Sequence, residues 1–61
     1  MKEYQIKIYE RSVIVCSENK RFASDDEAIN FGKQLFAEHP SAWNLVIGTD
    51  YGYASVFRMC R

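Results

Sequence analysis

The sequence contains few of the residues from which catalytic and metal sites are built. Its 61 residues include one histidine, His39, and two cysteines, Cys16 and Cys60. No second histidine or cysteine lies near His39 in the sequence, which argues against a zinc site. A Cys–His nucleophilic pair would require Cys16 or Cys60 to meet His39 in a pocket. The sequence has no glycine-rich phosphate loop, because Gly48 and Gly52 flank a predicted hairpin turn. These shortages favour a protein that is not an enzyme and that needs no metal or cofactor.

The chain also lacks an excess of charge and lacks a long apolar run. Eight basic residues balance eight acidic ones, which argues against a general polyanion binder and against an acidic DNA mimic. The longest apolar run is Val13 to Cys16, far short of the roughly 20 residues of a membrane helix. Met1 to Glu3 lead straight into a strand pattern, so we expect no signal peptide and a cytoplasmic protein with free thiols.

The composition is that of one small folded domain spanning residues 1–61. With 48% hydrophobic and 15% aromatic residues, the chain is too apolar to be disordered. A chain of this length buries only about 60% of the surface that its unfolded form exposes, so the core is small. A core of this size leaves little room for an enclosed active site, and this also favours a binding module over an enzyme.

The first third of the chain predicts an antiparallel hairpin. Tyr4 to Tyr9 alternate between apolar and polar residues, as expected for a strand with one buried face. We place a two-residue turn at Glu10–Arg11 and a second strand at Ser12–Cys16. In this register Ile8 lies opposite Val13 and Ile6 opposite Val15, while Ile14 and Cys16 point away from the core. The polar segment Ser17–Arg21 is predicted to be a loop.

The middle of the chain predicts one amphipathic helix, from about Asp25 to Glu38. Ser24 lies three residues before Glu27, which is the spacing of a capping box. Helix capping also explains the carboxylates of residues 25–27, which favour the positive end of the helix dipole. His39–Pro40 ends the helix. Gly32 lies near the centre of the apolar stripe, and we expect the helix backbone to approach the sheet closely there.

The last third predicts a second hairpin, with Asp50–Gly52 as a three-residue turn. This turn places Thr49 opposite Tyr53, Ile47 opposite Ser55, Leu45 opposite Phe57 and Trp43 opposite Met59. The fold class is therefore α+β in ββαββ order, with the helix packed on one face of an antiparallel sheet. The predicted core consists of Tyr4, Ile6, Ile8, Val13, Val15, Ala28, Ile29, Phe31, Leu35, Phe36, Trp43, Leu45, Ile47 and Phe57.

One helix covers one face of a sheet, and the other face, which we call the outer face, also carries apolar side chains. We predict that it binds another protein or a second copy of this chain, because an apolar patch with an aromatic anchor and a polar rim is typical of such sites. A mildly apolar solvent-exposed face, or a sheet curled over these residues, is the alternative. The predicted contact residues are Lys7, Tyr9, Ile14, Val46, Tyr51, Val56 and Arg58.

Other surfaces and partners remain open. Tyr51 and Tyr53 at the second turn are suitable contact residues, unless Tyr53 packs over the end of the sheet. A homodimer with a structural or regulatory role would also cover the outer face. Single-stranded nucleic acid is a third possible partner, because a face carrying Tyr9, Lys7 and Arg58 could stack a base. Phosphates could then be contacted by Lys20, Arg21 and Arg61. The balanced charge and the single aromatic residue clearly on this face make nucleic acid the less favoured partner.

The segments "RFASDDEAINFGKQLF" and "WNLVIGTDYGYASVFR" together resemble several very small phage proteins, among them compact anti-CRISPR inhibitors. The shared pattern is an apolar residue before a serine-capped helix, followed by a hairpin with glycine at its turn. It spans Arg21 to Arg58, and its motifs are generic. The resemblance implies a viral, non-enzymatic inhibitor that blocks a host defence complex by occupying one of its surfaces, and it transfers no binding residue.

Overall fold

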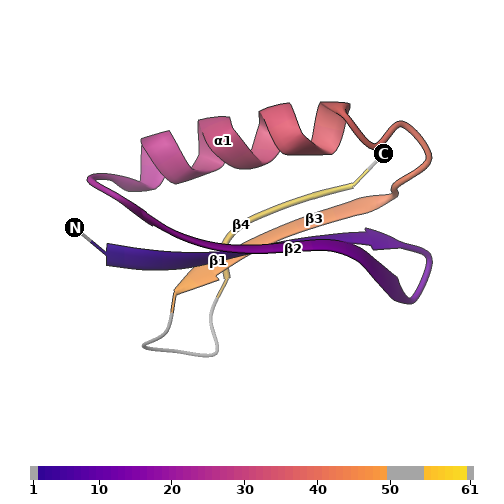
Figure 1. Ribbon diagram of the computed structural model, residues 1–61, viewed down its shortest axis with the longest axis horizontal. Coiled ribbons are helices and arrows are strands. Elements are labelled where there is room, and N and C mark those ends of the chain that lie inside the picture. The colour runs from indigo at the N-terminus through magenta and orange to yellow at the C-terminus, as the bar shows by residue number, and fades with distance from the viewer. Residues whose placement is uncertain (1, 50–54, 61) are drawn as a thin grey trace.

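Four strands and one helix form a two-layer α+β structure. A computed structural model describes residues 2–49 and 55–60. The elements in chain order are β1 (Lys2–Glu10), β2 (Val13–Phe22), α1 (Asp25–Ala37), β3 (Asn44–Thr49) and β4 (Ser55–Cys60). The strands make one antiparallel sheet in the order β2-β1-β3-β4, and α1 lies across one of its faces (Figure 1). This confirms the predicted fold class and the ββαββ order. Within the described ranges, the helix is too short and too polar to cross a membrane.

The two central strands supply most of the core. β1 and β3 pair with each other and each has a further strand on its other side. Successive side chains of a strand point to opposite faces of the sheet, so alternate residues of β1 and β3 point toward α1 and are buried beneath it. The fully buried hydrophobic residues are Tyr4, Ile6, Ile8, Ala28, Phe36, Ala42, Leu45 and Ile47.

The start of α1 follows from its capping residues. Ser24 is the N-cap, and its hydroxyl accepts a hydrogen bond from the Glu27 amide at 3.3 Å. The Glu27 carboxylate reaches back to the amide of Ala23 at 3.0 Å, one residue before the position expected in a capping box. The helix ends at Ala37 with Glu38 as its C-cap, close to the predicted end.

Gly32 marks the closest approach of the helix to the sheet. It is buried, and a Cβ atom placed there would lie 2.6 Å from Cδ1 of Ile47 and 3.5 Å from Cδ1 of Leu45. The first distance is shorter than non-bonded carbon atoms tolerate. The prediction that glycine permits close helix–sheet packing is confirmed, and β3 is the strand approached.

The first hairpin differs from the predicted register. The turn is at Arg11 and Ser12, with Arg11 at a φ of 59°, so Glu10 pairs with Val13. A β-bulge follows, because Tyr9 pairs with Ile14 whereas Ile8 pairs with Cys16. The bulge inserts Val15 as an extra residue and reverses which face the following residues occupy. It explains how four consecutive apolar residues fit a strand whose partner alternates.

Several predictions about this strand were therefore wrong. Ile14 does lie on the outer face, beside Tyr9, but Cys16 lies on the helix side and packs against the core. Val13 and Val15 are 63% and 41% exposed and are not core residues. The segment Ser17–Arg21 is not a loop, because β2 continues to Phe22 and pairs with the first half of β1. Its polarity reflects exposure at a sheet edge, where the backbone is still satisfied by the neighbouring strand.

The second hairpin keeps the predicted faces of its buried residues but not its register. Ile47 pairs with Phe57 and Leu45 with Met59, two residues away from the predicted pairs. The register shifts at a bulge between Ile47 and Gly48, where Val56 is the extra residue of β4. The predicted turn at residues 50–52 and the predicted pair of Thr49 with Tyr53 lie outside the described residues.

Trp43 is the largest error in the predicted core. It precedes β3, its amide donates to the Tyr9 carbonyl at 2.8 Å, and its side chain is 57% exposed. The short connection after α1 buries Ala42 instead, which was not predicted. Phe22 was also missed; its ring packs edge-on against Tyr4, with ring centroids 5.8 Å apart.

Tyr4 links β1 to the first turn of α1. Its hydroxyl donates a hydrogen bond to the carboxylate of Asp25. This hydrogen bond, together with burial and the nearby charges of Asp25 and Glu27, raises the pKa of Tyr4 from 10.0 to about 12. The folded protein therefore favours the protonated form of this phenol.

We expect this pKa to make stability fall in strong alkali. The contribution of Tyr4 to the free energy of unfolding is complete below pH 10 and is lost as the pH rises toward about 12, because only the unfolded chain ionises readily in this window. Urea unfolding across this range should show a steeper loss for the wild type than for Tyr4→Phe, which has no phenol to ionise at this position. Parallel curves for the two proteins would contradict the raised pKa.

Candidate functional site

The outer face of the sheet is the face opposite to α1, and it is the predicted location of the contact residues. Tyr4, Ile6 and Ile8 point toward α1, so the alternate residues of β1 point the other way. In the described part of the chain no helix lies over this second face (Figure 1). Its side chains are therefore the ones to compare with the prediction.

The strand register arranges the outer face in rows that run across all four strands. Directly opposite residues of antiparallel strands share a face, so each row can be traced from one edge to the other. The upper row consists of Ile14, Tyr9, Asn44 and Cys60. The middle row consists of Ser17, Lys7, Val46 and Arg58. The lower row consists of Asn19, Gln5, Gly48 and Ser55.

Five of the seven predicted contact residues lie together in the upper and middle rows. Tyr9 pairs with Ile14 in the upper row, and Val46 lies between Lys7 and Arg58 in the middle row. Ile14 is 47% exposed, and Val46 is half-buried although no helix covers it. The monomer therefore does not enclose these two side chains in its own interior.

The other two predicted residues are not part of these rows. Val56 lies at the bulge of β4, is half-buried and packs against the core, so its placement on the outer face was wrong. The extra residue of a bulge interrupts the alternation of side chains between the two faces of the sheet. The predicted register contained no bulge, so it assigned Val56 to the wrong face. Tyr51 lies outside the described residues, as does Tyr53.

The outer face is hollowed where the upper and middle rows meet β4. This hollow has a volume of about 460 Å³, and its lining consists of Tyr9, Asn44, Leu45, Val46, Arg58, Met59 and Cys60. Arg58 is held at this edge by a hydrogen bond from its Nε to the Ser55 hydroxyl at 3.2 Å. The hollow combines an aromatic ring, an aliphatic side chain, a guanidinium group and an amide, which can meet a mixed polar and apolar partner surface.

Sequence reasoning missed two features of this surface. Neither Asn44 nor Cys60 was predicted as a contact residue, although both line the hollow. The register joins both residues to the predicted surface, because Asn44 pairs with Tyr9 on one side and with Cys60 on the other.

A second exposed surface lies at the end of the sheet near the first turn. Glu10, Arg11, Pro40, Ser41, Ala42 and Trp43 line a shallow hollow of about 380 Å³ there. Trp43 is the exposed aromatic residue of this hollow, and the Ser41 hydroxyl donates to Glu10 at 3.1 Å. This surface could have been inferred from the position of Trp43, which directly precedes β3 and so lies in a connection rather than inside a strand.

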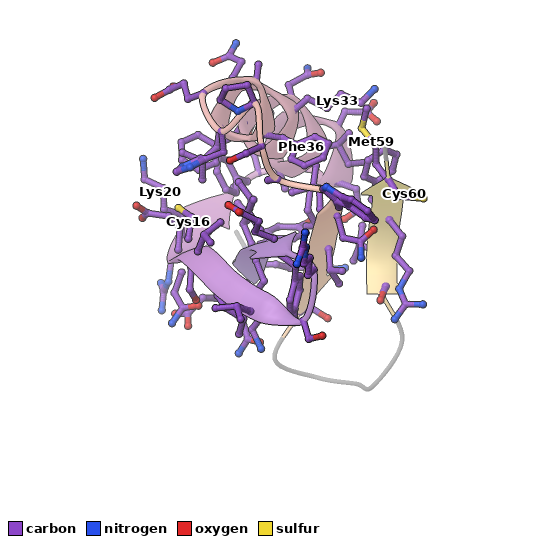
Figure 2. All side chains as sticks on the ribbon, turned by 90° about the vertical axis from the view of Figure 1, so that its right-hand side faces the viewer. Cys16, Lys20, Lys33, Phe36, Met59 and Cys60 are labelled. Atoms are coloured by element: carbon purple, nitrogen blue, oxygen red, sulfur yellow. The ribbon has the colours of Figure 1, made fainter. Side chains whose placement is uncertain are left out.

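The thiols do not form a site within one molecule. Cys16 is on edge strand β2 and Cys60 is on the opposite edge strand β4, as Figure 2 shows. Two strands lie between them, so the edges are about 14 Å apart, whereas a disulfide requires Cα atoms within about 7 Å. In residues 2–49 and 55–60, no group of three or more His, Cys, Asp or Glu side chains is placed to hold a metal ion.

No protein-family model, curated protein or solved structure matches the chain. The function therefore has to be inferred from the chemistry of the surface. Two surfaces are therefore candidates for a binding site. The outer face is the more extensive of the two, because its side chains come from all four strands. The hollow beside Trp43 draws on a turn and a connection only.

Proposed function

We propose that this protein is a non-enzymatic binding module that attaches to another protein through the outer face of its sheet. The observation that carries the proposal is that Tyr9, Ile14, Val46, Lys7 and Arg58 lie together on the face of the sheet opposite to α1. Aromatic and aliphatic side chains supply contact area, while the two cationic groups give orientation and specificity.

Inhibition by surface occlusion is the mode of action that we propose for such a module. A sheet face that covers a partner's own binding surface can block it without any chemical step. The resemblance to small phage inhibitors of host defence complexes supports this mode, and the separated thiols support a cytoplasmic setting.

A homodimer that covers the same face is the second candidate. Ile14 is 47% exposed on edge strand β2, and edge strands are ready to pair with another chain. Sedimentation at tens of micromolar distinguishes the two, because a monomer at this concentration excludes a stable dimer.

Replacing Ile14 with aspartate should weaken capture of the partner. The substitution places a desolvated charge in the contact and is expected to weaken binding at least about tenfold, or 1.4 kcal/mol. The test is affinity capture from the organism that encodes the protein, identification by mass spectrometry, and a binding titration with the purified partner. Val13→Asp is the matched control, because Val13 is 63% exposed on the same strand and lies on the other face of the sheet.

Amide spectra of both variants establish that they are folded. Ile14→Thr offers a second variant that keeps a β-branched side chain and loses only apolar contact. If Ile14→Asp retains full affinity while Val13→Asp loses it, the binding surface is elsewhere and the assignment of the outer face is wrong.

A further inference from the structure

The charged side chains of the protein are distributed unevenly between the two sides of the sheet. Seven acidic and seven basic residues lie in residues 2–49 and 55–60, so their charges cancel. The register places four of them on the outer face: Glu3, Lys7, Arg21 and Arg58. Three cations and one acid give this face a net charge of +2. The other described residues, with four cations and six acids, carry −2.

The positive charge of the outer face is concentrated around Val46. Glu3 pairs directly with Arg21, so these two charges offset each other at one end of the face. Lys7 lies opposite Ser17 and Val46, and no acidic residue faces it in the register. Arg58 lies opposite Val46 from the other side. Two cations that pair with no acidic residue in the described strands therefore flank the apolar centre of the surface.

Half of the acidic residues outside the outer face are held there for a local reason. Asp25, Asp26 and Glu27 fill the first turn of α1, where the helix dipole and the capping interactions stabilise them. The helix packs on the face opposite to Lys7 and Arg58. In residues 2–49 and 55–60 the balanced charge is therefore the sum of a positive outer face and a negative remainder of the molecule.

We propose, building on the function proposed above, that the outer face selects an acidic segment of another protein that also carries aromatic or aliphatic side chains. Carboxylates of the segment would meet Lys7 and Arg58, and its apolar side chains would pack on Tyr9, Ile14 and Val46. Complementary charge speeds encounter and excludes partners of the wrong sign, while the apolar contacts retain the complex. The acidic back of the molecule repels the same segment, so that binding is confined to one face.

Nucleic acid fits this surface less well, although it is also anionic. Single-strand binders stack successive bases on several aromatic side chains, and Tyr9 is the aromatic residue that the described strands place on the outer face. Ile14 and Val46 occupy positions where such a binder would need stacking or phosphate contacts. The apolar centre between two cations instead matches a polypeptide that alternates acidic and apolar side chains.

The test uses the full chain, isotope-labelled for amide spectra, and a random copolymer of glutamate and tyrosine as the probe. We expect saturable shifts at the amides of Lys7, Val46 and Arg58, and an affinity that falls as salt is raised. Lys7→Glu and Arg58→Glu should each weaken binding about tenfold. Lys2→Glu is the matched control, because Lys2 lies on the same strand with the opposite facing and its replacement changes the net charge equally.

Other occupants give different results. Failure of the glutamate–tyrosine copolymer to bind at low salt overturns the proposal, as does equal binding of a lysine–tyrosine copolymer or tighter binding of oligothymidylate. A dimer in sedimentation that Lys7→Glu dissociates would make the occupant a second copy. If Lys2→Glu weakens binding as much as Lys7→Glu does, the loss comes from the net charge of the protein and not from the outer face, and the proposal is overturned. If the captured partner depends on Ile14 but not on Lys7 or Arg58, the acidic specificity fails while the binding module stands.

Discussion

Phe36→Ala is expected to leave the protein largely without a stable fold. Among the residues of α1, only Ala28, Gly32 and Phe36 are fully buried, and Phe36 is the only one of them with a large side chain. Replacing a buried phenylalanine with alanine costs about 3–5 kcal/mol. A domain of this length has roughly 3–9 kcal/mol of stability in total, so a single truncation removes much of it.

Urea unfolding followed by circular dichroism measures this loss. Gln34→Ala is the control, because Gln34 is exposed in the same helix and alanine is a good helix former there. We expect this control to match the wild type within about 0.5 kcal/mol. A loss below about 1 kcal/mol for Phe36→Ala would mean that α1 is not held to the sheet as described.

Gly32→Ala is expected to destabilise the protein by up to about 2 kcal/mol, even though alanine favours helices. The gain in helix propensity is about 1 kcal/mol. The added methyl group would lie 2.6 Å from Cδ1 of Ile47, a side chain with no exposed area, and overpacking of this kind costs about 1–3 kcal/mol or more. We expect the steric cost to exceed the gain because Ile47 is fully buried, so its Cδ1 has to shift within a close-packed core.

A double-mutant cycle with Ile47→Val tests this cause directly. Valine lacks the Cδ1 atom that meets the new methyl, and Ile47→Val alone should cost about 0.5–1.5 kcal/mol. We expect the double variant to be more stable than the sum of the single losses predicts, with a coupling of at least about 1 kcal/mol. Gly48→Ala is the control, because a Cβ at Gly48 meets nothing within 4 Å. Additive losses would show that the contact with Ile47 is not the cause.

The helix and the central strands could be predicted because local signals agree there. Ser24 and Glu27 cap the helix within one turn, and the apolar stripe that includes Phe36 has the helical period. Tyr4, Ile6 and Ile8 alternate without interruption in a strand that has neighbours on both sides. In these segments the face of each residue follows from its own neighbours in sequence.

The edge strands could not be predicted in the same way. The face of Cys16 depends on the bulge at Val15, and the face of Val56 depends on the bulge in β4. A bulge is decided by how the partner strand pairs, and a shift of one residue moves every following side chain to the other face. Ser17–Arg21 was misassigned for a related reason, since a polar edge strand and a polar loop have similar composition.

The candidate site was predictable to the extent that it rests on the central strands. Lys7 and Tyr9 are on the outer face because Ile6 and Ile8 are buried, and Val46 follows in the same way from Leu45 and Ile47. Ile14 was placed correctly even though the register around it was wrong. The pairing of Arg58 with Val46, and with it the positive surroundings of the apolar centre, required the register of β4.

The most direct test of the binding face is an amide spectrum of the protein with and without its captured partner. Perturbed and protected amides should cluster in β1, β3 and β4 around Tyr9, Val46 and Arg58, while the exposed side of α1 around Gln34 stays unchanged. Perturbation confined to α1 or to the hollow beside Trp43, with the outer face unaffected, would contradict the assignment.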